Sequence, residues 1–151
     1  MSCSFALPVF SGPANGVLPA AVVSGPRAWV GFDLTSDGGR SWELVSQRPV
    51  AVGQSLDGSS GYPLVSMATR SDWWVLGWGK NGLTTQVTSN GGTSWGQATA
   101  RAPGGVPVAL DALDADHALV TMERTSETTG TTSWLLATGN GGHSWERLAL
   151  R

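Results

Sequence analysis

Three octets of nearly the same sequence carry the side-chain oxygens best placed for chemistry. They are TSDGGRSW at 35–42, TSNGGTSW at 88–95 and TGNGGHSW at 138–145. Carboxylate oxygens are preferred calcium ligands, so a repeated acidic loop suggests a cation site. The acidic position, however, is Asp37 in the first octet but Asn90 and Asn140 in the others. The shared group is a carbonyl oxygen rather than a charge. This pattern favours a hydrogen-bonded cap of a turn and predicts no metal.

The glycine pairs of the octets predict the tips of β-hairpins. Asp-Gly and Asn-Gly favour tight hairpin turns, because glycine adopts positive φ without a Cβ clash. The flanking stretches LTTQVTS and SWLLATG, before the second and third octets, read as strands. Each octet is therefore expected to join two antiparallel strands, with its tryptophan starting the outgoing strand and buried between strands.

A longer repeat surrounds each octet and predicts four strands per unit. The units are expected at about 17–47, 62–101 and 106–151 of a single 1–151 domain. Units of this size with four strands are typical of β-propeller blades. Residues 1–16 are expected to form an orphan strand and a linker, because Ser4 and Phe5 align with Ser94 and Trp95. The predicted fold is all-β, a partial propeller of three four-stranded blades.

The octets resemble the Asp-box, or bacterial neuraminidase repeat, Ser/Thr-x-Asp-x-Gly-x-Thr/Ser-Trp. The stretch SDWWVLGWGKNGLTTQVTSNGGTSW is most similar to propellers like the photosystem II assembly and stability factor. Sialidase-superfamily propellers are the other similar group. The resemblance implies propeller blades, an extracytoplasmic location and binding of proteins or carbohydrates, while the box itself marks fold rather than activity. The matching structural residues, with Asn in place of Asp in two copies, are Thr35, Asp37, Gly39, Ser41 and Trp42; Thr88, Asn90, Gly92, Ser94 and Trp95; Thr138, Asn140, Gly142, Ser144 and Trp145.

Composition excludes several partner classes. Only 13% of residues are charged, the net charge is −2, and Lys80 is the one lysine. The chain therefore lacks the basic cluster expected for nucleic-acid or anionic-membrane binding. No apolar run is long enough to span a membrane, and the first ten residues lack the basic start of a signal peptide. The chain is thus expected either in the cytoplasm or with an export signal outside this sequence. No motif predicts a cofactor.

A sialidase-like activity would require residues that the sequence does not supply in the expected places. The sialidase resemblance implies three arginines, a tyrosine nucleophile with a glutamate partner, and an aspartate acid/base. Arg48 is followed directly by Pro49, and Tyr62, the one tyrosine, has no assignable glutamate. The sequence therefore favours a non-catalytic module that binds a protein or glycan through blade loops. The alternative is a fragment of an exo-sialidase-like or other glycoside hydrolase, with catalytic residues on blades outside this chain.

Two further groups of residues are candidates for binding. Trp73 and Trp78 could face outward and stack on a ligand, with Arg70 and Arg124 in nearby turns, whereas Trp29 and Trp74 are expected in the core. An acidic cluster suggests a cation site or, alternatively, a turn shaped by Asp114 and Asp116, with Asp72 in the equivalent place to Asp116. The members of that cluster are Asp111, Asp114 and Asp116.

Three blades alone would leave apolar faces at both ends of the stack. Exposed apolar faces of this size favour association. The sequence therefore predicts either a segment of a longer propeller or a homodimer.

Overall fold

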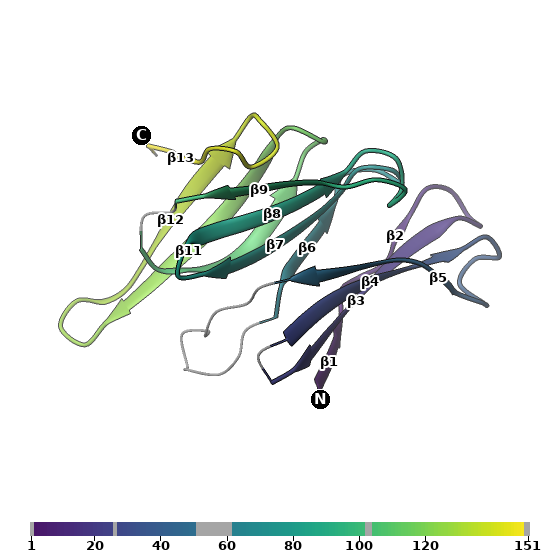
Figure 1. The fold of residues 1–151 in the computed structure, drawn as a ribbon, viewed down its shortest axis with the longest axis horizontal. Helices are drawn as coiled ribbons and strands as arrows, with labels where there is room; N and C mark the ends of the chain where they lie inside the picture. The colour runs from purple at the N-terminus through teal and green to yellow at the C-terminus, as the bar shows by residue number, and fades with distance from the viewer. Residues whose placement is uncertain (1, 26, 51–61, 102–103, 150–151) are drawn as a thin grey trace.

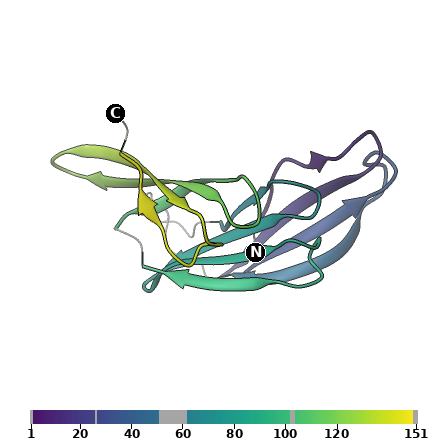
Figure 2. The same ribbon diagram turned by 90° about the horizontal axis from the view of Figure 1, so that it is seen from above.

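The computed structural model describes residues 2–25, 27–50, 62–101 and 104–149, which form an all-β fold (Figure 1). These residues make three antiparallel sheets, each an up-and-down meander. The all-β prediction is confirmed. The three sheets follow one another in chain order and lie side by side (Figure 2).

The first sheet contains five strands in the order β1-β3-β4-β5, with β2 also paired to β3. Its strands are β1 (Ser2–Phe5), β2 (Val9–Phe10), β3 (Gly16–Ser24), β4 (Arg27–Thr35) and β5 (Glu43–Val50). The first octet connects β4 to β5.

The second and third sheets contain four strands each, paired in sequence order. The second is β6 (Leu64–Met67), β7 (Trp73–Gly79), β8 (Gly82–Thr88) and β9 (Gly96–Ala100). The third is β10 (Val106–Ala112), β11 (Ala118–Ser126), β12 (Gly130–Thr138) and β13 (Glu146–Arg147). In all three sheets the octet follows the third strand position.

The N-terminal segment is not an orphan strand, which corrects the expected boundaries of the first repeat. Both β1 and β2 pair antiparallel with β3, so together they occupy the first strand position of the first sheet. The stretch at 17–23, which begins the expected first unit, lies in the second strand position, and β4 runs without a break into the octet as the third strand. Because the chain runs from Arg27 to Thr35 as one strand, residues 17–50 supply three strands of the sheet rather than the four that the repeat predicted.

One backbone hydrogen bond repeats in all three sheets and fixes this alignment. The second residue of each Asp/Asn-Gly pair donates its N–H to the turn between the first and second strands. The pairs are Gly38 to Ala14 at 2.9 Å, Gly91 to Ser71 at 3.0 Å and Gly141 to Asp116 at 2.9 Å. Asp116 is therefore equivalent to Ser71, and the expected match to Asp72 is off by one residue.

Packing between the sheets forms two separate interfaces. Phe32 of the first sheet stacks on Trp73 of the second, with ring centroids 4.8 Å apart and an interplanar angle of 17°. Between the second and third sheets, Leu76 and Leu83 pack with Val120 and Leu136, all at most 1% exposed. Because β7 alternates its side chains, Trp73 and Val75 face one neighbour while Trp74 and Leu76 face the other. The second sheet is thus covered on both faces.

The tryptophans of the second and third octets pack against the preceding sheet. Trp95 lies 5.3 Å from Phe32, and its Nε1 donates to Ser46 Oγ at 3.2 Å. Trp145 lies edge-on to Trp74 at 6.5 Å. Trp42 instead meets Phe10 of its own sheet at 6.1 Å. All three rings are half-buried.

The two outer faces of the stack differ in polarity. On the first sheet, most side chains on the face opposite Val30 and Phe32 are apolar, and Leu44 among them is 55% exposed, although Asp33 and Gln47 share this face. On the third sheet, the outward positions are mixed: the acidic Asp111, Glu123 and Glu146 lie among the apolar Leu119, Leu135 and Ala137. The outer face of the first sheet is therefore mainly apolar, while that of the third sheet mixes apolar and acidic side chains. The apolar outward residues of the first sheet are Phe5, Leu18, Ala20, Val22, Trp29, Leu44 and Pro49.

We predict that truncation of the octet tryptophans will have unequal effects on stability. Trp95→Ala removes contacts with two rings and a hydrogen bond across the first interface, so we expect a loss of about 3 kcal/mol in the free energy of unfolding. Trp42→Ala removes a contact with Phe10 and a hydrogen bond to the Gly39 carbonyl, both within its own sheet, and we expect a loss of about 1 kcal/mol. Urea unfolding of both variants measures the difference. Equal losses would contradict the proposed role of the preceding sheet.

Candidate functional site

The oxygens that suggested a metal site are used within the octet turns. In the first octet, Thr35 Oγ1 donates to Asp37 Oδ1 at 2.8 Å and accepts the N–H of Gly39 at 2.9 Å. The same Asp37 oxygen accepts the N–H of Ser41 at 3.0 Å. The second and third octets make equivalent bonds through Asn90 and Asn140. These are the bonds that a side chain capping a turn makes.

Aspartate and asparagine serve this turn equally because the serine hydroxyl reverses its role. Ser41 Oγ donates to Asp37 Oδ2 at 2.6 Å. In the second octet, Asn90 Nδ2 donates to Ser94 Oγ at 2.8 Å. Hydrogen bonds, first from the Ser41 side chain and then from its backbone, lower the pKa of Asp37 to about 2. Among the described residues, no group of three or more His, Cys, Asp or Glu side chains is placed to hold a metal ion.

The acidic cluster shapes a turn rather than converging on one point. Asp114 Oδ1 accepts the N–H groups of Asp116 and His117, both at 2.8 Å, and its carboxylate lies 2.9 Å from His117 Nδ1. The backbone bonds, from Asp116 first, hold the pKa of Asp114 below its usual value. Asp111 is exposed on β10, opposite Leu119. The turn alternative therefore describes this segment.

The two tryptophans expected to stack on a ligand are buried. Trp73 is 0% exposed against Phe32, and its Nε1 donates to the carbonyl of Arg70 at 2.8 Å. Trp78 is 8% exposed between the second and third sheets. Neither ring face is open to solvent, which corrects the prediction of outward stacking. Trp29, expected in the core, instead lies half-buried on the outer face of the first sheet.

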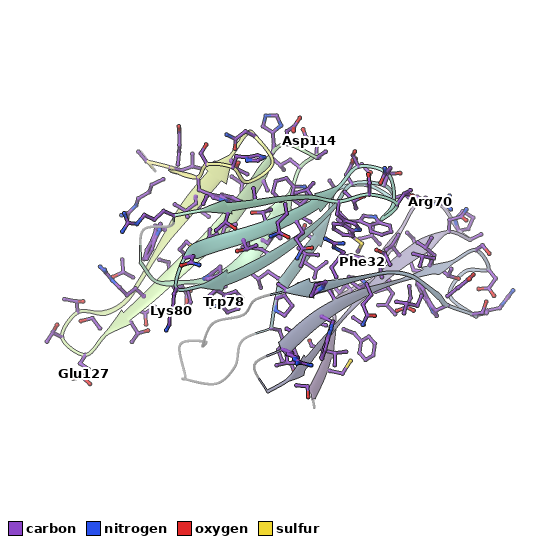
Figure 3. The ribbon with its side chains drawn as sticks, in the orientation of Figure 1. Phe32, Arg70, Trp78, Lys80, Asp114 and Glu127 are labelled. Carbon is purple, nitrogen blue, oxygen red and sulfur yellow. The ribbon has the colours of Figure 1, made fainter. Side chains whose placement is uncertain are left out.

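A cavity of about 490 Å³ opens at the ends of the second and third sheets opposite the octets. The turn between β7 and β8 contributes Lys80 and Asn81, and Arg101 follows β9. Trp78 and Lys80 lie close together at this end (Figure 3). The remaining lining residues are Gly79, Gly82, Leu83, Gly104, Gly105 and Met122.

A second, smaller cavity of about 120 Å³ shares Gly104 with the first. It is lined also by Arg124, Thr132, Trp134 and Arg147. The Arg147 guanidinium lies 5.4 Å from the centroid of the Trp134 ring. We call the two adjoining cavities the basic groove, after its four cationic residues: Lys80, Arg101, Arg124 and Arg147.

The groove gathers positive charge in a chain that has little of it. Its four cations are drawn from only nine Lys and Arg residues in the whole sequence. No Asp or Glu is among the described residues that line either cavity. Glu123 points to the opposite face of the third sheet, because its neighbour Met122 faces inward. The groove is therefore a cationic surface on a protein of net negative charge.

Strand length and glycine backbone geometry keep the groove open. Strands β11 and β12 have nine residues each, against seven in β7 and β8, and their hairpin extends beyond the second sheet (Figure 1). Gly105 has φ of 101°, and a Cβ there would lie 2.6 Å from the Glu123 carbonyl oxygen. Only glycine fits this position, so bare backbone forms that part of the wall.

Of the four residues predicted to bind a ligand, the structure brings only two to this groove. Trp78 and Arg124 line its two cavities, while Arg70 and Trp73 lie at the octet end. Sequence reasoning missed Lys80, Arg101 and Arg147. These residues lie far apart in the chain, so no local motif marks them, and only the stacking of two sheets brings them together.

The residues considered for a sialidase-like reaction have other surroundings. Tyr62 is half-buried against the first interface and lines an apolar cavity with Phe5 and Leu64. No carboxylate is among the described residues that line that cavity. Arg48 Nε donates to Gln86 Oε1 at 2.7 Å and so joins the first sheet to the second. These two residues are thus placed in packing and cross-sheet bonding.

Comparisons with known proteins give no match. Neither the family models, nor the curated proteins, nor the solved structures contain one that is significantly similar to this chain. Across the described ranges, the structure contains no helix with the length and hydropathy needed to cross a membrane.

We predict that Asp37→Asn preserves the first octet at neutral pH and removes its acid sensitivity. A carboxyl whose pKa falls on folding stabilises the folded state fully above its unfolded pKa of 3.8, and this contribution is lost as pH falls toward 2. We expect equal melting temperatures at pH 7, and a smaller drop for the variant in acid. Thermal unfolding followed by circular dichroism measures both.

Asp37→Ala is the matched control for this prediction. It removes both side-chain acceptors, so its melting temperature should fall at pH 7 as well as in acid. Titration of Asp114 is common to all three proteins and cancels in the comparison. A marked loss of stability in Asp37→Asn at pH 7 would show that the charge, not the carbonyl oxygen, holds the turn.

Proposed function

We propose that this chain is a non-catalytic binding module built from Asp-box propeller blades. It binds a protein partner or a glycan through the loops at the end of the sheets opposite the octets. The observation that carries this proposal is the basic groove, whose walls come from the connecting loops of two consecutive sheets. Sites of this kind, on loops held by a rigid scaffold, commonly carry function in repeat folds.

The repeated octet network supports the Asp-box part of the proposal. The same threonine, Asp/Asn and serine positions cap the same turn three times, and the following tryptophan packs at or near a sheet interface. For the alternative, a segment of a glycoside hydrolase, the described residues offer no specific observation. Tyr62 and Arg48 are already engaged in core packing and in cross-sheet bonding.

A charge-reversal pair at the groove tests the binding function. We expect Lys80→Glu/Arg101→Glu to abolish a signal that the wild-type chain gives on a glycan array or a peptide array. Both side chains are exposed, so the variant should keep its melting temperature. Arg27→Glu/Arg40→Glu, exposed residues of the first sheet, is the matched control and should retain the signal.

Three outcomes of this test would contradict the proposal. One is the absence of any signal on either array, and another is a signal that the groove variant retains. The third is turnover of a fluorogenic sialoside by the purified chain, which would support the hydrolase alternative.

We further propose that a second copy of the chain covers the apolar outer face of the first sheet. The outer face of the first sheet carries one carboxylate, Asp33, among mainly apolar side chains, whereas that of the third sheet carries Asp111, Glu123 and Glu146. A two-fold pairing of first sheets therefore leaves the more highly charged faces in water. Three strands of eight or nine residues, with the short β1 and β2 along one edge, cover roughly 500 Å², from the usual strand spacing and rise. That area is below the roughly 600 Å² per partner of the smallest stable interfaces, so the pairing should be weak. A concentration-dependent dimer follows.

Light scattering over a range of concentrations tests this assembly. We expect the wild-type chain to shift from monomer to dimer as concentration rises, and Trp29→Glu to remain monomeric, because it places a charge in the interface. Leu148→Glu, at an exposed leucine after β13 in the third sheet, is the control and should still dimerise. A wild-type chain that stays monomeric throughout would contradict pairing through this face and would favour a further blade as its cover.

A further inference from the structure

We propose that the basic groove binds an acidic peptide segment of a protein partner, with an apolar side chain of the peptide seated in the larger cavity. This inference rests on the proposed binding function and names the chemistry of its ligand. Three properties of the groove carry it: its charge, its apolar floor, and the small number of its side chains that can accept hydrogen bonds.

The charge of the groove selects an anionic ligand. Lys80, Arg101, Arg124 and Arg147 line it, and no described lining residue is acidic. Within the described part of the chain, the one ion pair is His117 with Asp114, at the other end of the third sheet. The four cations are therefore not engaged by carboxylates there. Cationic clefts of this kind attract anionic partners and speed their association.

The larger cavity adds a place for an apolar side chain. Its floor consists of Trp78, Leu83 and Met122, which are at most 8% exposed and belong to the second interface. A volume of about 490 Å³ lies within the range typical of ligand pockets. An acidic peptide with an interspersed leucine or similar residue matches a cationic rim above an apolar floor.

The polar side chains of the groove favour a peptide over an acidic glycan. Sugar hydroxyls donate hydrogen bonds, but lysine and arginine side chains have no acceptor atoms. Asn81 and Thr132 are the only described lining side chains that can accept. Carboxylates of a peptide need only donors, which the groove supplies.

Fluorescence anisotropy with a dye-labelled peptide of alternating Glu and Leu tests this inference. We expect saturable binding that weakens as ionic strength rises, since screening acts on exposed charge pairs. Lys80→Gln/Arg101→Gln should raise the dissociation constant about tenfold, a loss of about 1.4 kcal/mol. Arg27→Gln/Arg40→Gln should leave it unchanged. A peptide of alternating Lys and Leu is the control for apolar binding alone.

Two other anionic probes, oligogalacturonate and single-stranded DNA, distinguish failure of this inference from failure of the proposed function. If labelled oligogalacturonate or single-stranded DNA binds through Lys80 and Arg101 and the acidic peptide does not, the peptide assignment is overturned while binding at the loop end stands. If none of the three probes binds, the assignment is likewise overturned, and the array experiment decides the proposed function separately. Equal binding of the Lys–Leu peptide would also overturn it, since charge would then not select the ligand.

Discussion

The stacking of the second and third octets on the sheet that precedes each of them sets the arrangement of everything else. A Cβ added at Gly92 would lie 2.9 Å from both Ser46 and Trp73, and Gly142 packs against Thr85 in the same way. Glycine at these positions lets the turn of one sheet rest directly on the face of the sheet before it. The contact fixes the offset between neighbouring sheets. That offset brings Lys80 and Arg101 of the second sheet beside the hairpin of the third, which is how the basic groove arises.

The two interfaces solve the same packing problem with different chemistry. In the first, Ser46 accepts from Trp95 Nε1, and Gln86 donates to the Pro49 carbonyl at 2.7 Å. In the second, Ala98 occupies the position of Ser46. Ser46 pairs with Phe32 and Ala98 pairs with Thr85, and these two partners each lie three residues before the first threonine of an octet. Buried polar atoms without a partner within the described residues gather there, and each costs about 1–3 kcal/mol unless water reaches it. They are Trp78 Nε1, Thr85 Oγ1, Trp134 Nε1 and Trp145 Nε1.

The hairpin tips follow from local chemistry and could be predicted from the sequence. Features that depend on contacts between distant segments could not. Positive φ at Gly38 and Gly39 follows from the Asp-Gly-Gly sequence itself, and so does the cap by Asp37. The first repeat was misaligned because an alternating apolar run such as that of β3 suits the first or the second strand position equally. Its true first strand is short and interrupted around Pro8, so it gives a weak signal. The groove depends on residues from three separate segments, and no local pattern encodes that meeting.

Each sheet is built from one continuous stretch of chain, with the first and last strand positions at its two edges and the octet before the last strand. Among the described strands none is exchanged between sheets, so a gene segment that encodes one unit carries the strand pairings of its own sheet. Duplication or deletion of such a segment would add or remove a whole layer and one interface without cutting a sheet. The architecture therefore behaves as a one-dimensional array, in which sequence change at one interface leaves the others intact. The divergence of Ser46 and Ala98 between the two interfaces is the kind of independent drift that such an array permits.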